Sequence, residues 1–90
     1  MFVVSPKQVL KEYNAGFDSG TKDKAALQND STPANIRFLI NENVRTKMLS
    51  GIKDGVPLVR AYWQGYYDAM QGWHRNTNYT QDSKPPWPKD

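Results

Sequence analysis

Few side chains of this 90-residue sequence could carry out catalysis. His74 is the one imidazole, there is no cysteine, and none of the usual serine-hydrolase, zinc-protease or phosphate-loop motifs occurs. Asp18 and Asp68 each lie shortly after a glycine in two similar segments and could form a carboxylate pair, although capping and salt bridging are commoner roles for such residues. We therefore expect no catalytic residue, no metal site and no cofactor, and predict that the protein is not an enzyme.

Aromatic and cationic side chains offer a different chemistry, which is binding. Arg60, Trp63, Tyr67 and Arg75 are predicted to share the side of a helix that faces away from its small residues, and Trp87 lies among prolines near the end. Aromatic and guanidinium groups stack on unpaired bases, and they are also the commonest anchors of protein interfaces. We predict these five as partner-binding residues. Two alternatives stay open: Trp63 and Tyr67 pack against a neighbouring helix, and Trp87 packs back onto the domain.

The first helix that must position these groups is predicted to begin at Pro6. Ser5 is placed to cap it, the missing N–H of Pro6 costs nothing in the first turn, and Gln8 completes a capping box. Gly20 is predicted as the C-terminal stop. Residues 21–32 have weak periodicity and end in a polar cluster, which indicates a connector with one short helical turn.

Two further helices are predicted over residues 33–50 and 57–73. Thr32 and Pro33 repeat the cap-then-proline signature, and Pro57 can open the third helix. The second helix carries an apolar stripe at helical spacing that is typical of a core-facing side. Its members are Ile36, Phe38, Leu39, Ile40, Val44 and Met48.

Glycines inside the first and third helices need an explanation, because glycine in a helix interior costs roughly 1 kcal/mol relative to alanine. Ala61, Gly65 and Ala69 recur every four residues and so form one stripe, as Gly16 and Gly20 do. We predict that these stripes let the two helices approach closely while aromatic side chains fill the rims of the contact. The rim residues are Tyr13, Phe17, Tyr62, Tyr66 and Trp73.

The predicted fold class is therefore all-α: a small three-helix domain with close glycine and alanine packing and a flexible, proline-rich C-terminal tail. The helical domain is expected over residues 1–75, followed by an extended or disordered tail over 76–90, where the final KPPWPKD excludes helix. A chain of this length can bury only a thin core.

The amino-acid composition and the net charge indicate a cellular compartment and the chemical class of a partner. The absence of cysteine suits a reducing cytoplasm, and the N-terminal residues lack the basic and apolar regions of a signal peptide. No run of 18 apolar residues occurs, so no membrane span is expected. A net charge of +3 and a pI near 9.3 permit an acidic partner such as RNA, DNA or an acidic protein face.

The two glycine-aromatic segments resemble ribosome modulation factor, a family of small helical proteins. GFDSG at residues 16–20 matches the first segment of that family, and WQGYYDAM at residues 63–70 approaches the second. The resemblance implies binding to the small ribosomal subunit and suppression of translation, with basic and aromatic side chains against rRNA. Family members are shorter and more basic, and here residues 21–57 add a further helix.

Two functions follow as expectations. The first is a non-enzymatic protein that binds RNA or the ribosome and regulates translation, with an affinity that falls steeply with salt. The second is a protein-binding modulator or inhibitor, of phage or accessory type, that docks on a single host protein through aromatic anchors. The small-residue stripe could also meet a second copy of the chain, which would make a homo-oligomer.

Overall fold

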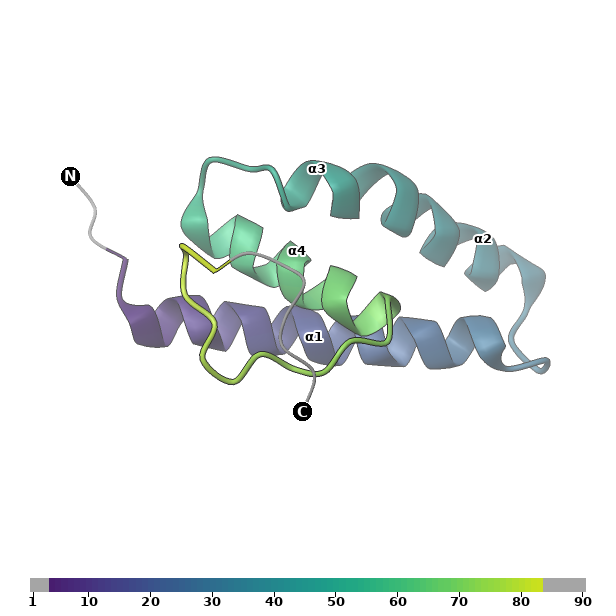
Figure 1. Ribbon diagram of the computed structural model, residues 1–90. Coiled ribbons are helices and arrows are strands. Elements are labelled where there is room, and N and C mark those ends of the chain that lie inside the picture. Colours follow the sequence, from purple (N-terminus) through teal and green to yellow (C-terminus); the bar gives the residue numbers. More distant parts are fainter. Residues whose placement is uncertain (1–3, 84–90) are drawn as a thin grey trace.

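The computed structural model describes residues 4–83 and forms three helical segments (Figure 1). The first is α1 (Pro6–Gln28) and the last is α4 (Pro57–Met70). Between them α2 (Ala34–Glu42), the π-helix η1 (Asn43–Met48) and the short α3 (Leu49–Gly51) follow one another as a single segment. The described residues contain no strand, so the predicted all-α three-helix class is confirmed.

The predicted start of α1 is confirmed atom by atom. The side-chain oxygen of Ser5 accepts from the Lys7 amide at 3.2 Å, and the Ser5 amide donates to the Gln8 side chain at 3.3 Å. These two bonds form the capping box, which satisfies backbone groups that the first helical turn leaves without intrahelical partners. Proline also occupies the first turn of α4, as predicted.

The predicted end of the first helix at Gly20 is wrong, because α1 continues to Gln28. Gly20 does not have the positive φ of a glycine cap, which among the described residues only Gly72 has. A Cβ atom on Gly20 would lie 2.6 Å from the Tyr66 carbonyl oxygen, so this glycine permits a tertiary contact instead of ending the helix. Residues 21–28 are consequently helix and not connector.

The helix α4 ends at Met70, three residues earlier than predicted. Gly72 adopts φ 76°, its amide donates to the Ala69 carbonyl at 3.1 Å, and the Trp73 amide donates to the Asp68 carbonyl at 2.9 Å. This pair of bonds around a left-handed glycine is the Schellman motif. The chain therefore turns sharply here and returns along α1 (Figure 1).

The close approach of α1 and α4 is confirmed, and it joins backbone to backbone. A Cβ atom on Gly16 would lie 1.7 Å from the Tyr62 carbonyl oxygen, and one on Gly65 would lie 2.1 Å from the Tyr13 carbonyl oxygen. No side chain fits in either place, so the cost of glycine in the helix is offset by the contact it permits.

The segment after α4 contributes to the core. Tyr79 is 4% exposed and stacks on Tyr13 with ring centroids 4.5 Å apart, in a cluster with Val9 and Ala61. Tyr79 thus lies within the region that the sequence assigns to the tail. The proline-rich end, residues 84–90 with Trp87, lies outside the described residues.

We call residues 34–53, from α2 to the turn after α3, the arm. No Cα atom of α2 lies within 8 Å of one in α4, and α2 makes few contacts with α1. Of its apolar stripe, Ile40 and Met48 are buried. A π-helix has more residues per turn than an α-helix. Residues four apart, such as Val44 and Met48, therefore stay close to one side of η1. The arm is therefore held to the α1–α4 pair mainly at its C-terminal half.

Candidate functional site

A buried polar cluster joins α1 to α4. The Tyr13 hydroxyl donates to one carboxylate oxygen of Asp68 at 2.6 Å, and the Gln64 side-chain amide donates to the other at 2.8 Å. Asp68 is 0% exposed, and the Tyr13 hydroxyl also accepts from the Asn76 amide at 3.0 Å. The cluster fixes α1, α4 and the returning segment relative to one another, so its role is structural. Asp18 is exposed and pairs elsewhere, which excludes the carboxylate pair with Asp68.

Trp63 and Tyr67, predicted to bind a partner, are half-buried and packed within the chain. The Trp63 ring makes edge contacts with Tyr62 and Tyr66, at centroid distances of 5.1 and 5.4 Å, and it covers Gly51, where a Cβ atom would lie 2.0 Å from it. Tyr67 meets Trp73 edge to face at 5.6 Å. The contact with Gly51 agrees with the alternative that Trp63 packs against the second helical segment.

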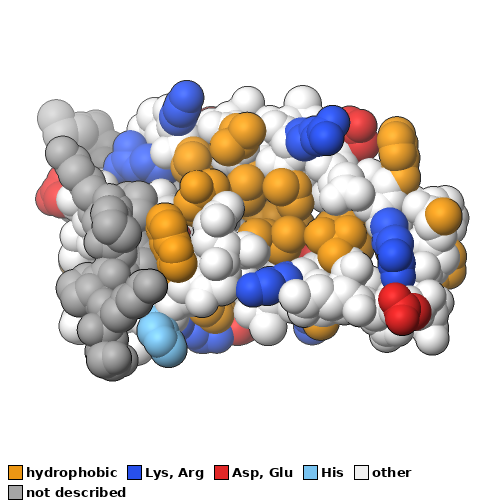
Figure 2. All heavy atoms as spheres, turned by 45° about the vertical axis from the view of Figure 1, so that its right-hand side comes forward, with side chains coloured by type: hydrophobic (Ala, Val, Ile, Leu, Met, Phe, Trp, Pro, Cys, Tyr) orange, Lys and Arg blue, Asp and Glu red, His pale blue; other side chains and the backbone are white. Residues whose placement is uncertain are grey.

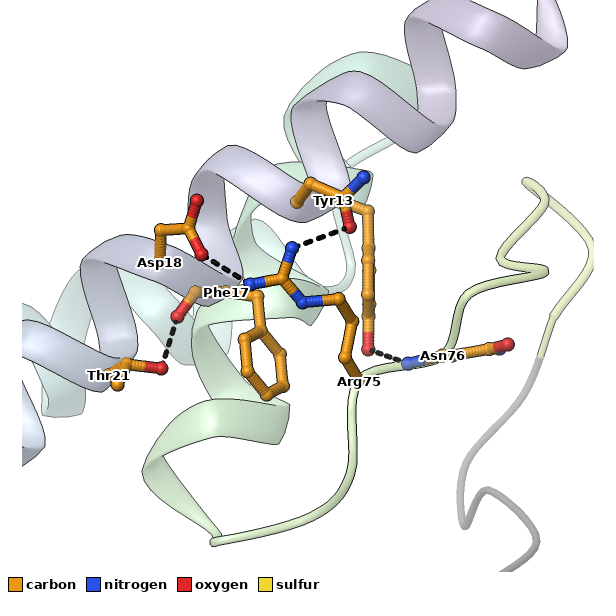
Figure 3. A network of polar contacts seen from close by, with 7 residues as sticks. Tyr13, Phe17, Asp18, Thr21, Arg75 and Asn76 are labelled. Carbon is orange, nitrogen blue, oxygen red and sulfur yellow. Dashed lines mark hydrogen bonds and ion pairs between the residues drawn. The ribbon is translucent and has the colours of Figure 1, made fainter.

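Arg60 and Arg75 lie in different environments. Arg60 donates to the backbone carbonyls of Asp54 and Gln81, at 3.4 and 3.2 Å. Arg75 lies after the end of α4 and points back to α1, where it forms an ion pair with Asp18 and its guanidinium lies 4.8 Å from the centre of the Phe17 ring (Figure 3). Arg60, Trp63 and Tyr67 follow one another at helical spacing on α4, so they share one side of it, and Arg75, which lies beyond the end of that helix, is the residue that does not join them.

Two tyrosine hydroxyls bridge α4 to the C-terminal half of α1. Tyr62 donates to Ser19 at 3.0 Å, and Tyr66 donates to the carboxylate of Asp23 at 2.5 Å. Burial raises the pKa of Tyr66, and the hydrogen bond to the Asp23 carboxylate and the charge of that group raise it further. Burial also raises the pKa of Tyr79, against the opposing influence of Arg60.

The raised pKa of Tyr66 predicts that stability is lost at alkaline pH. Above about pH 10 the unfolded chain releases the tyrosine proton while the folded chain retains it, so a rising pH favours unfolding. We expect the free energy of unfolding to fall by about 1.4 kcal/mol per pH unit from this residue. Urea titrations between about pH 9 and about pH 11 measure the slope, and Tyr66→Phe is expected to reduce it. An identical slope in both proteins would contradict the assignment.

Exposed apolar side chains are concentrated on the arm. Phe38 is 63% exposed, Leu39 57%, Leu49 48% and Ile36 40%. Three of these were predicted to face the core; that prediction is wrong, because α2 lies too far from α4 to cover them. Figure 2 shows a face on which hydrophobic side chains gather, with Lys and Arg side chains around them. An exposed group of this kind is typical of an interaction site.

The arm also differs from the remaining chain in charge. It carries four cations, Arg37, Arg45, Lys47 and Lys53, and one carboxylate, Glu42, for a net charge of +3. The other eight cations are balanced by eight carboxylates. This asymmetry is visible in the sequence and is the signal by which the arm could have been found.

Depressions lie beside Leu58 and beside Arg60 on the described surface. A depression of about 600 Å³ beside Arg60 includes Asp82 and Ser83 among its lining residues but no histidine. Within residues 4–83 no three His, Asp or Glu side chains lie close enough to hold a metal ion. None of the helices over the same range has both the length and the apolar character needed to cross a bilayer.

Comparison with protein-family models, curated proteins and solved structures gives no match to this chain. The resemblance to ribosome modulation factor therefore stays a prediction based on the two glycine-aromatic segments.

Proposed function

We propose that this protein is a small non-enzymatic binding module that docks on a partner protein through the arm. The observation that carries the proposal is the exposure of Phe38, Leu39 and Leu49 on a helix that the α1–α4 pair covers only in part. Complete burial of a large apolar side chain is worth roughly 1.5 to 3 kcal/mol, and these three side chains, about half exposed, leave part of that free energy unused. A partner that covers them would recover part of that free energy.

The arm has the form of a helix that binds in a groove. Phe38 and Leu49 lie eleven residues apart, with exposed Arg45 between them, and Leu39 is exposed beside Phe38. Helices that dock in grooves present a few large apolar anchors at such helical intervals. The α1–α4 pair, joined by glycine contacts and the buried Asp68 cluster, would act as the rigid support that presents the arm.

Binding to a protein is favoured over base stacking on RNA by the environment of the aromatic side chains. Stacking needs a free ring face, whereas Trp63 and Tyr67 are half-buried and in contact with other rings. The Arg75 guanidinium is already paired with Asp18 and placed near Phe17. The exposed Phe38 ring and the exposed aliphatic groups of the arm suit an apolar protein surface better than a phosphate backbone.

The proposal predicts that Phe38→Asp with Leu49→Asp removes partner binding. The matched control is Ala15→Asp with Ala25→Asp, which places two carboxylates ten residues apart on the exposed side of α1. Both double variants are expected to fold, because all four positions are exposed. Loss of two anchors is expected to weaken capture at least about tenfold in the arm variant and to leave the control unchanged.

The measurement is affinity capture from a cell lysate, with and without ribonuclease, at low and high salt, with captured proteins and RNA both quantified. A protein that is lost only with the arm variant and survives ribonuclease supports the proposal. Capture that both double variants retain contradicts the proposal. Capture that disappears with ribonuclease also contradicts it and favours the predicted binding to RNA or the ribosome.

A further inference from the structure

From the charge of the arm we infer the chemical class of its partner: a protein surface whose apolar side chains are framed by carboxylates. The inference rests on the proposed function and adds the requirement for acidic groups. The arm holds a net charge of +3 while the rest of the chain is neutral, so the excess of positive charge lies on the segment that also exposes Phe38, Leu39 and Leu49.

The cations of η1 are available for pairing. Arg45 and Lys47 are exposed, and within residues 4–83 neither forms an ion pair. Arg45 lies seven residues after Phe38 and four before Leu49, and Lys47 lies eight residues after Leu39. Each cation is thus about two helical turns or less from an exposed apolar group, so one partner surface can engage both kinds of side chain.

A second copy of the chain or a nucleic acid would not give favourable contacts to both the cations and the apolar side chains of the arm. A second copy of the chain would bring one arm of charge +3 against another, and like charges facing each other across an interface are unfavourable. A single-stranded nucleic acid would pair with Arg45 and Lys47 and would offer a base to stack on Phe38, but it would leave Leu39 and Leu49 without an apolar partner. An apolar protein surface framed by Asp and Glu satisfies both kinds of group and steers the encounter by charge.

Two synthetic amphipathic helical peptides of roughly 18 residues test the inference, since this length spans about five helical turns. Both have a leucine seam; one has Glu on the flanking positions and the other has Lys there. The full chain is titrated with each peptide and with a single-stranded oligouridine, and amide NMR shifts identify the residues involved. The acidic peptide is expected to shift the amides of residues 36–49, while the lysine peptide and the oligouridine leave them unchanged.

The charge-reversal variant is Arg45→Glu with Lys47→Glu, and its control is Lys7→Glu with Lys11→Glu, two exposed cations of α1. We expect the arm variant to weaken binding of the acidic peptide at least about tenfold, a change of about 1.4 kcal/mol, and the control variant to change it less than about twofold.

The possible failures are distinguishable. Equal binding of the two peptides would overturn the acidic inference and leave the proposed docking function intact. Binding of neither peptide would also overturn it, and the capture experiment with the Phe38 and Leu49 variant would then decide the proposed function separately. Binding of the oligouridine alone would overturn both in favour of RNA, and self-association that depends on Phe38, measured by sedimentation, would assign the surface to a second copy.

Discussion

Replacing Gly65 with leucine is expected to leave the protein largely unfolded. The Cβ atom alone would lie 2.1 Å from the Tyr13 carbonyl oxygen and 2.8 Å from the Phe17 amide nitrogen. Both are backbone atoms of α1 and cannot move aside as a flexible side chain could. The helices would have to separate, and the contacts of Tyr13 with Asp68 and Tyr79 would be lost with that movement. We expect a cost of at least about 3 kcal/mol, a large share of the stability of so small a domain.

Thermal and urea unfolding followed by circular dichroism measures this effect, and Gly55→Leu is its control. A Cβ atom on Gly55 would meet no other atom within 4 Å, and Gly55 has no positive φ. Leucine at this position is therefore expected to change stability by less than about 1 kcal/mol. If Gly65→Leu were as stable as the parent protein, the backbone contact between α1 and α4 would not exist as described.

Replacing Asp68 with alanine is the second large effect that we expect. The variant removes the acceptor of two buried donors, the Tyr13 hydroxyl and the Gln64 amide. Each lost hydrogen bond to a charged group costs about 1.5 to 3 kcal/mol, and the deleted atoms of this fully buried side chain leave a void. The expected loss is therefore about 3 kcal/mol or more in the free energy of unfolding.

The control for this prediction is Asp18→Ala. Asp18 comes from the similar segment in α1, but its carboxylate is exposed and its partner is Arg75 at the surface. Exposed ion pairs contribute about 0 to 1 kcal/mol, so this variant should unfold at nearly the urea concentration of the parent. Equal losses for Asp18→Ala and Asp68→Ala would contradict the structural role assigned to the buried cluster.

Both large effects concern the support and not the proposed docking surface. Variants of Phe38, Leu49, Arg45 and Lys47 are expected to change binding with little effect on folding, because these side chains are exposed. Separate measurements of stability and of binding can therefore test the two parts of the molecule independently.

Local signals in the sequence predicted the start of α1, the proline that opens α4 and the stripes through which the two helices meet. A capping box depends on residues within one helical turn, and a glycine in a helix interior is costly unless a neighbour needs the space. Gly16 and Gly65 therefore indicate the contact from the sequence alone. The aromatic rims were predicted from the large side chains near these glycines, Tyr13 and Phe17 near Gly16, and Tyr62 and Tyr66 near Gly65.

Tertiary structure alone decided which side chains are left exposed and which are buried. Asp18 and Asp68 come from similar segments, yet only Asp68 meets the Tyr13 hydroxyl and is buried. Gly20 was predicted to end a helix that in fact continues, because its neighbour is Tyr66 of α4. Phe38 and Leu39 fit an amphipathic helix, but spacing along one helix does not determine whether another helix lies close enough to cover them. Burial depends on contacts between residues far apart in the chain, and those contacts here left the arm exposed.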